Sequence, residues 1–408
     1  MKSLIFAFAL FAPLSFSQEW TQLRGPAGRG HSDATTIPVS FNESDYNWKV
    51  PVSGEGYSSP VLWGDRLFLT SATGRETGTR YVHCFDIEDG REIWKKEFTF
   101  TPYHLHKHNS FASSTPTVDA ERLYISWTDA GSKRIALALD HHGKLLWEVQ
   151  LGNFSGQHGS GSSPVLYKHI LVVPNDGRNE DSFITGLDKT NGKTLWRMER
   201  SGSNKACYTM PILYQPEGEA EQLVSINTAD GITGYDPLTG KKLWEEALNF
   251  GYRTVGSPTQ SGHLFFVTGG SGGSGKESAA VRPGTGEKPA ETVYKLNRSL
   301  PYVPWTLAYK DLIYLWSDGG VLTCVIGATG KTIYTERVGG KYYSSPILIG
   351  DKIYCADRDG ELVVVQAGPH FKILARNAIG EGMYATPAIH RGVMYLRTHK
   401  HLISIGGN

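Results

Sequence analysis

Three things are scarce in this sequence of 408 residues: long apolar runs, an excess of charge of either sign, and cysteine. After the first 17 residues no segment is apolar enough to cross a bilayer, so we expect no membrane span. The 41 Lys and Arg residues balance 40 Asp and Glu residues and form no basic stripe. We therefore expect no nucleic-acid partner.

The few cysteines also show none of the common cysteine motifs. They form no adjacent pair, no CxxC motif and no zinc-type spacing. In an exported chain they could pair as disulfides, but each lies in an apolar stretch typical of a strand. We therefore predict four buried free thiols, at Cys84, Cys207, Cys324 and Cys355.

The amino terminus has the pattern of a cleavable signal peptide. Lys2 supplies a positive charge, residues 4–16 are apolar, and a small-x-small cleavage site precedes Gln18. No cysteine lies nearby for lipid attachment. We expect a soluble, monomeric protein that is periplasmic or secreted. The expected organisation is a signal peptide at 1–17, an amino-terminal arm at 18–45 and one domain at 46–408.

What the sequence does contain is a repeat with a spacing of 40–56 residues. YSSPVLWGDRLFLTS begins at Tyr57, YSSPILIGDKIYCAD begins at Tyr343, and related strings occur eight times in all. A repeat of this length indicates an array of supersecondary units. The anchor residues of the eight repeats are Pro60, Pro116, Pro164, Pro211, Pro258, Thr306, Pro346 and Pro387.

Each repeat predicts four short strands. The anchor strand leads through a two-residue polar turn to an alternating strand. The unit ends in a turn and a tryptophan, as in DIEDGREIW at residues 86–94. The turn glycine supplies a positive φ, and the tryptophan is an apolar plate that can pack between neighbouring sheets. The sequence therefore predicts an all-β, eight-bladed β-propeller of four-stranded antiparallel blades.

The ends of the array predict how the ring closes. The last unit, residues 384–405, lacks a fourth strand. A lone strand, YNWKVPV at residues 46–52, precedes the first unit and carries Trp48 in the place of the missing tryptophan. We predict that this amino-terminal strand completes the last blade, which hides a sheet edge.

Repeats of the form SSPV…LD…TGK…W resemble those of the pyrroloquinoline-quinone-like propeller superfamily. That group includes quinoprotein dehydrogenases and the propeller lipoprotein of the outer-membrane β-barrel assembly machinery. The segments WTQLRGPAGRG, HKHNSFASSTP, SDGGVLTC and AGPHFKILARN are similar to those of exported propeller proteins common in planctomycetes. The resemblance implies the fold and leaves the activity open, because one fold hosts many functions.

The resemblance raises the question whether this chain binds pyrroloquinoline quinone (PQQ) with calcium. The dehydrogenases carry an adjacent cysteine pair beside it, and this chain has none. Their calcium ligands and catalytic aspartate match no motif here. The sequence therefore favours a protein without a cofactor and without enzymatic activity. If it is an enzyme, an oxidoreductase of quinoprotein type is expected.

A histidine-rich stretch is the first candidate site. PYHLHKHNSFASSTP places His104, His106 and His108 at alternate positions, just before the inner strand of the second blade. A metal needs three or four ligands converging at about 2.0–2.2 Å, and a loop seldom holds the extended shape that this requires. We predict no metal site. His106 and Asn109 are the candidates for a ligand-facing loop, and a plain surface loop is the alternative.

A set of tyrosines is the second candidate site. Four of the eight repeats have a tyrosine three residues before the anchor, at the entrance to the inner strand. Such tyrosines would form a partial ring at the channel mouth and offer flat faces and hydroxyls to a ligand. The alternative is that they only wedge neighbouring blades. They are Tyr57, Tyr208, Tyr343 and Tyr384.

Two glycine-rich segments complete the list. GGSGGSGKES, residues 269–278, fits GxxxxGK, but Glu277 replaces the required Ser or Thr and no helix follows. We predict a flexible insertion in the fifth blade and no nucleotide site. RGPAGRG, residues 24–30, predicts a solvated arm. The alternative is that it folds over the ring and brings Arg24 or Arg29 to the channel.

These features favour binding as the function. We expect an exported scaffold that holds a protein partner or a carbohydrate-like ligand at the channel face. The alternative is a divergent quinoprotein oxidoreductase or a polysaccharide-active propeller enzyme. An enzyme is expected to have a deep polar pocket with convergent titratable groups, and a scaffold a shallow face with an exposed apolar patch.

Overall fold

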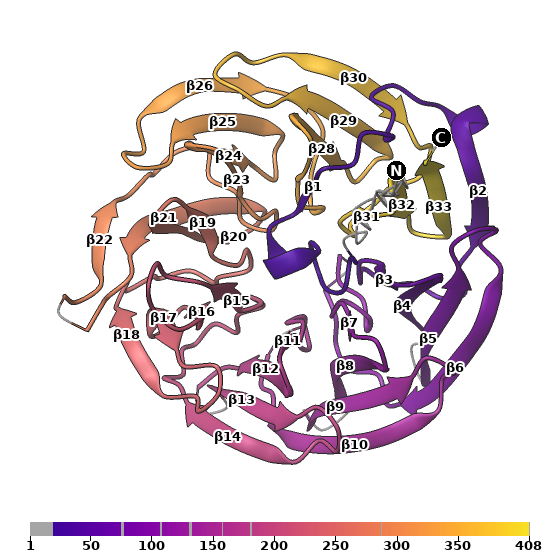
Figure 1. Cartoon of the computed structure of the whole chain (residues 1–408), viewed down its shortest axis with the longest axis horizontal. Helices are drawn as coiled ribbons and strands as arrows, with labels where there is room; N and C mark the ends of the chain where they lie inside the picture. Colours follow the sequence, from indigo (N-terminus) through magenta and orange to yellow (C-terminus); the bar gives the residue numbers. More distant parts are fainter. Residues whose placement is uncertain are drawn as a thin grey trace, which may run out of the picture.

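Eight β-sheets surround a central axis in the computed structural model (Figure 1). The structure describes residues 19–74, 77–106, 108–129, 133–156, 158–179, 182–286 and 288–407. Seven sheets have four strands and one has five. Pairing within each blade is antiparallel, and the predicted eight-bladed propeller is confirmed. The signal-peptide prediction falls on residues outside the described part.

The strands follow one another from the inside of each blade to the outside. Blades 1 to 4 consist of β3 (Val61–Trp63), β4 (Arg66–Thr73), β5 (Gly78–Asp86), β6 (Glu92–Phe100); β7 (Thr117–Val118), β8 (Arg122–Asp129), β9 (Lys133–Asp140), β10 (Leu145–Asn153); β11 (Val165–Tyr167), β12 (Ile170–Asp176), β13 (Ser182–Asp188), β14 (Thr194–Glu199); and β15 (Ile212–Tyr214), β16 (Gln222–Asn227), β17 (Gly231–Tyr235), β18 (Lys242–Glu246).

The second half of the ring repeats this order. Blades 5 to 8 consist of β19 (Thr259–Ser261), β20 (Leu264–Ser271), β21 (Ser274–Arg282), β22 (Glu291–Tyr294); β23 (Leu307–Tyr309), β24 (Leu312–Trp316), β25 (Val321–Ile326), β26 (Thr332–Arg337); β27 (Ile347–Ile349), β28 (Lys352–Ala356), β29 (Glu361–Gln366), β30 (Ile373–Ala378); and β31 (Ala388–His390), β32 (Val393–Arg397), β33 (His401–Gly406), β2 (Tyr46–Pro51).

The amino-terminal strand β2 closes the ring. It pairs antiparallel with β33, so that Trp48 lies opposite Ser404 and Val50 opposite Leu402. The prediction that residues 46–52 supply the missing fourth strand of the last blade is therefore confirmed. Because the first strand of the domain is held in the last blade, no blade is left with an incomplete sheet.

The tryptophan of an outer strand packs under the turn of the next blade. The indole N–H of Trp147 in β10 donates to the carbonyl of Lys189, 3.0 Å away in blade 3. A Cβ on Gly192 would lie only 2.7 Å from the Trp147 ring, and Gly192 has φ +76°. The predicted plate between sheets is confirmed, and the turn glycine is required both for its φ and for its lack of a side chain.

An inner hydrogen-bond ring joins the blades around the channel. It uses the residue just before each anchor, whose backbone N–H donates to the hydroxyl of the equivalent residue in the next blade. Met210 in blade 4 and Trp305 in blade 6 have no hydroxyl and interrupt the ring. The six links are Ser59 to Thr115, Thr115 to Ser163, Met210 to Ser257, Trp305 to Ser345, Ser345 to Thr386 and Thr386 to Ser59.

The amino-terminal arm crosses the centre of the ring (Figure 1). Its carbonyls at Trp20 and Gly30 accept hydrogen bonds from the inner-strand N–H groups of Leu62 and Leu348, at 2.9 and 2.7 Å. The arm also contributes the 3-10 helices η1 (Pro26–Gly28) and η2 (Glu43–Asp45) and the strand β1 (His31–Ser32), which pairs parallel with β27.

Arg24 fixes the arm in the channel. Its side chain is 2% exposed, lies over the Trp305 ring, and donates to the carbonyls of Thr306 and Pro346 at 3.1 and 3.0 Å. The prediction of a solvated arm is therefore wrong. The inner strands carry backbone groups that no strand of their own blade pairs, and the arm satisfies several of them.

The glycine-rich segment of blade 5 is also ordered, which corrects the predicted flexible insertion. It forms the ends of β20 and β21, where Thr268 lies opposite Ser278. Gly272 and Gly273 make the turn between the strands with φ of +60° and +72°. A two-residue hairpin turn of this kind requires positive φ at its central residues. Gly272 and Gly273 therefore allow β20 to pair with β21.

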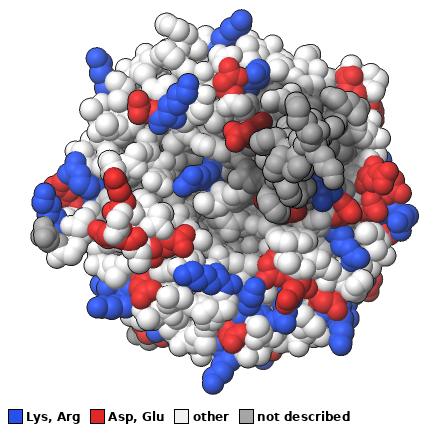
Figure 2. All heavy atoms as spheres, in the orientation of Figure 1, with Lys and Arg blue, Asp and Glu red and all other residues white. Residues whose placement is uncertain are grey.

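The cysteines and the charges on the face drawn in Figure 2 are distributed as the sequence predicts. All four cysteines are free and buried, as predicted. Within the described ranges no helix is long and apolar enough to cross a membrane. Acidic and basic side chains are interspersed over the face of the molecule drawn in Figure 2.

Candidate functional site at the channel mouth

The channel contains a cavity of about 730 Å³, here called the channel cavity. Leu23 of the arm lines it together with Met210 and Trp305, and these three side chains belong to one apolar cluster. Met210 and Trp305 are the two residues that interrupt the inner hydrogen-bond ring. The arm thus closes the channel on one side, and the cavity is lined on the other side by the loops that lead into the inner strands.

All six residues predicted as candidate ligand contacts line the channel cavity. They come from five blades or the loops before them, and the propeller brings them together although the sequence separates the first from the last by more than 300 positions. They are Tyr57, His106, Asn109, Tyr208, Tyr343 and Tyr384.

Three of the four tyrosines form one wall. The ring centroids of Tyr57 and Tyr384 are 4.5 Å apart, and those of Tyr343 and Tyr384 are 5.0 Å apart. They are neighbours because blades 7, 8 and 1 are consecutive. Tyr208 of blade 4 instead lies near Arg253, whose guanidinium carbon is 5.7 Å from the ring centroid. Tyr57, Tyr343 and Tyr384 therefore contact one another across blades, and all four tyrosines line the channel cavity.

The histidine loop contributes His108 to this wall. Arg358 of blade 7 donates to His108 Nε2 at 3.1 Å, and the Tyr384 hydroxyl lies 3.0 Å from His108 Nδ1. His106 lies beside His108 and His158, with ring centroids 5.4 and 5.7 Å away. His104 is exposed. A loop of blade 2 thus contacts blades 7 and 8 at the cavity.

Sequence inspection missed the charged groups of the channel cavity. Arg253, Asp318, Lys341 and Arg358 all line it. Asp318 and Arg358 follow the second strands of blades 6 and 7, in the hairpins that lead to the third strands. In an antiparallel blade, these hairpins lie at the same end as the entrance to the inner strand. That topological argument could have identified both residues.

Asp318 supplies the one carboxylate among the described residues that line the channel cavity. It is 5% exposed and accepts the backbone N–H groups of Tyr302 and Val303 at 2.7 and 3.2 Å. Burial raises the pKa of Asp318 to about 6, although these hydrogen bonds and Arg358 act in the opposite direction.

The opposite shift occurs at His158. Burial, and after it the positive charge of Arg253, lowers the pKa of His158 to about 4. Both effects favour the neutral imidazole. At neutral pH the fixed charges in the described lining are therefore the three cations Arg253, Lys341 and Arg358 and the carboxylate of Asp318.

The donor set does not fit calcium-dependent PQQ chemistry. Calcium takes six to eight oxygen ligands, several of them carboxylates. Among the described lining residues Asp318 alone carries a carboxylate, and its two oxygens already accept hydrogen bonds from backbone N–H groups. No group of three or more His, Cys, Asp or Glu side chains in the described ranges is placed to hold a metal ion.

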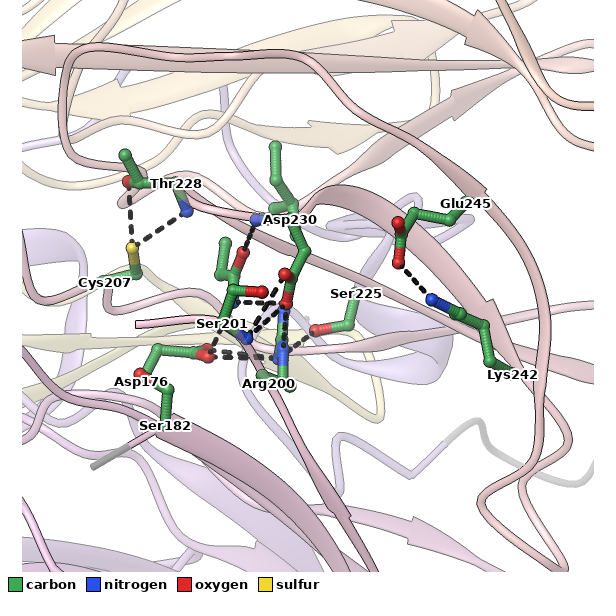
Figure 3. A network of polar contacts seen from close by, with 12 residues as sticks. Asp176, Ser182, Arg200, Ser201, Cys207, Ser225, Thr228, Asp230, Lys242 and Glu245 are labelled. Atoms are coloured by element: carbon green, nitrogen blue, oxygen red, sulfur yellow. Dashed lines mark hydrogen bonds and ion pairs between the residues drawn. The ribbon is translucent and has the colours of Figure 1, made fainter. Parts of the chain in front are cut away.

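A second polar cluster lies between blades 3 and 4, away from this lining (Figure 3). The Arg200 guanidinium lies 3.2 Å from Asp176 Oδ1, and both side chains are almost fully buried. Arg200 also donates to Ser225 at 3.2 Å, and Asp230 lies 3.9 Å away. Because Arg200 and Asp176 pair with each other and are enclosed, we assign this cluster to the joint between the two blades.

The comparison of sequences points to one family. A family model described as "Outer membrane protein assembly factor BamB" matches residues 42–196 and 78–301. The outer membrane protein assembly factor BamB of Shewanella oneidensis is 23% identical to this chain over 308 residues, which cover 74% of the chain and 69% of that protein.

Solved structures share the fold at low identity. BamB from Moraxella catarrhalis has a TM-score of 0.61 and 17% identity, and the alignment covers 88% of this chain and 96% of that one. The quinohemoprotein alcohol dehydrogenase of Comamonas testosteroni has a TM-score of 0.66 and 12% identity, with 96% and 81% covered. Because an assembly factor and an alcohol dehydrogenase share this architecture, function must be argued from the site.

Proposed function

The chain belongs to the family of the outer membrane protein assembly factor BamB, and from this membership we propose that it is an exported binding protein of the cell envelope. Its ligand, a protein partner or a carbohydrate-like molecule, is held at the channel face. The single observation that carries this proposal is the channel cavity, which the arm closes on one side and which tyrosines, histidines and cations line on the other.

The shape of the cavity supports binding by insertion. A shallow face was the expectation for a scaffold, whereas a volume of about 730 Å³ is typical of a ligand pocket. The exposed leucines and valine lie elsewhere, mostly on the outer strands β10, β14, β18 and β22. We therefore place the ligand, or a protruding segment of a partner, inside the channel cavity. Because the relative from Shewanella oneidensis is an outer membrane protein assembly factor, a partner in the envelope is favoured.

Crosslinking tests this placement. A photo-crosslinking amino acid is introduced in place of Tyr57 at the cavity, and in a control protein in place of Leu195, which is 43% exposed on β14. The two proteins are irradiated in envelope preparations. We expect defined adducts from position 57 and few from position 195. Adducts from position 195 alone would move the docking surface to the outer strands, and their absence at both positions would contradict the proposal.

The quinoprotein alternative has its own test. Calorimetric titration of the mature protein with PQQ, with and without calcium, is expected to show no saturable heat, because the described cavity offers too few carboxylates. Saturable binding in the micromolar range or tighter would restore the oxidoreductase hypothesis.

A further inference from the structure

We propose that the ligand of the channel cavity is an acidic oligosaccharide, whose sugar rings carry carboxylate or sulfate groups. This inference rests on the binding function proposed above and specifies the ligand class for the same site. Three features carry it: an excess of positive charge in the lining, a wall of tyrosines, and inner strands whose backbone donors are already used.

Among the described residues, the positive charges of Lys341 and Arg358 in the lining are not compensated by ion pairs. Lys341 and Arg358 form no direct ion pair with a carboxylate in the described part of the chain, and Asp318 is the only carboxylate of the described lining. The Nε of Arg358 is buried without a hydrogen-bond partner. A guanidinium with unused donors inside a concave site attracts carboxylate or sulfate, because such charge-assisted hydrogen bonds are among the strongest that proteins make.

Arg358 is held against the aromatic wall. Its guanidinium carbon lies 4.5 Å from the ring centroid of Tyr343 and 5.4 Å from that of Tyr384. His108 of the same wall accepts a hydrogen bond from one of the Arg358 amino groups at 3.1 Å. The cation is thus pre-oriented beside flat apolar faces, so that a ring carrying an anionic substituent can contact the tyrosines and the guanidinium together.

The rest of the lining favours a polyhydroxylated ligand. The Tyr208 hydroxyl is buried without a partner on another side of the cavity. Tyr57, Tyr343 and Tyr384 combine an apolar face with a hydroxyl, which suits the two faces of a sugar ring. The volume of about 730 Å³ lies within the roughly 300–1,000 Å³ of common ligand pockets.

An extended acidic peptide is less well accommodated. Peptides commonly bind to an open sheet edge through main-chain hydrogen bonds. The innermost strand of each blade is such an edge, but at its entrance the N–H groups of Ser59, Thr115 and Ser345 already donate within the inner hydrogen-bond ring. Side chains therefore have to provide the recognition, which favours a sugar with several hydroxyl and anionic groups.

The test is calorimetric titration of the mature protein with four probes. Oligogalacturonate carries carboxylates, a sulfated dextran oligosaccharide carries sulfates, cellohexaose is neutral, and hexaglutamate is an acidic peptide. We expect saturable binding of one or both acidic sugars, with affinity that falls steeply between 50 and 500 mM salt. Cellohexaose and hexaglutamate are expected to bind at least tenfold more weakly. The two acidic sugars distinguish carboxylate from sulfate recognition.

Single variants locate the anion site. Arg358→Met retains the stem and removes the charge, and we expect it to weaken binding of the preferred acidic sugar by about 10- to 100-fold. Lys341→Met changes an exposed side chain, cannot unfold the core, and is expected to weaken binding by about three- to tenfold. Arg298→Met is the matched control, because Arg298 is exposed and lies outside the cavity lining.

Several outcomes would overturn the inference. Equal binding of cellohexaose would remove the role of charge, and stronger binding of hexaglutamate would identify an acidic peptide as the ligand. An equal loss in Arg298→Met would show a bulk charge effect. If no probe binds while crosslinking from position 57 succeeds, the ligand class is wrong and the binding function stands. If both fail, the binding function fails with it.

Discussion

Asp318 shows how burial changes the chemistry of one side chain. Its pKa is raised to about 6 because burial removes water from the carboxylate, and the backbone N–H groups that replace the water, among them those of Tyr302 and Val303, do not offset this loss. The same residue is conspicuous in the sequence only as part of SDGGVLTC. Its neighbours in space, Tyr302 and Arg358, come from other segments of the chain. The burial of Asp318 therefore cannot be predicted from the residues next to it in the sequence.

A pH titration of stability tests this residue. In the unfolded chain the carboxyl has a pKa near 4, so the folded state holds the proton more tightly. The resulting stabilisation is complete below pH 4 and is lost as the pH rises through about 6. Asp318→Asn removes this dependence. The free energy of unfolding of the variant, minus that of the natural protein, is expected to rise by up to about 3 kcal/mol between pH 4 and 7.

Denaturant unfolding at several pH values measures that difference. Taking the difference between the two proteins cancels the titration of all the other carboxyl groups. A difference that stays flat over this range would mean that Asp318 is solvated in the folded protein.

At the scale of elements, the joint between neighbouring blades depends on a tryptophan and a glycine. Trp147 of β10 packs against Gly192, and the same contact occurs between Trp48 and Gly90 and between Trp94 and Gly143. The sequence identifies both residue types from the repeat. Their contact across the blade boundary needs the packed ring, because the two residues belong to different sheets.

Substitution of the turn glycine tests this joint. In Gly192→Ala the new Cβ would lie about 2.7 Å from the Trp147 ring in a backbone conformation with φ +76°. We expect a loss of about 3 kcal/mol or more, the sum of the cost of positive φ and of overpacking. The matched control is Gly350→Ala, because Gly350 has φ +59° and no atom near its would-be Cβ.

The control isolates the backbone term, which is expected to be about 1–2 kcal/mol. Urea unfolding followed by tryptophan fluorescence measures both variants. Equal losses in the two proteins would show that the Trp147 contact does not limit the size of the residue at position 192.

At the scale of the whole molecule, the arm turns an open channel into a cavity closed on one side. Trp20 is 1% exposed and belongs to the largest apolar cluster, together with residues of blades 1, 7 and 8. Arg24 donates to carbonyls of blades 6 and 7, more than 280 residues away in the sequence. The arm therefore joins distant blades across the axis, in addition to the closure by β2.

Removal of one arginine tests the role of the arm. Arg24→Ala removes the donor to the Pro346 carbonyl and one of the two donors to the Thr306 carbonyl, which keeps the Thr259 hydroxyl. It also removes the contact with Trp305, so we expect a loss of roughly 3 kcal/mol. Arg29→Ala is the control, since Arg29 is exposed, and is expected to change stability by less than about 0.5 kcal/mol. Similar effects of both substitutions on thermal unfolding would contradict this role.

The sequence by itself determined the blade number, the strand order and the closure by residues 46–52, because these follow from a local pattern that repeats along the chain. It also identified six residues of the channel cavity. The four tyrosines occupy equivalent positions of the repeat, which meet at the same end of a propeller, and His106 and Asn109 were identified from the histidine-rich stretch. Only the tertiary structure decided the path of the arm and the gathering of cations. His108 and Arg358 are 250 residues apart and meet only when the ring has closed.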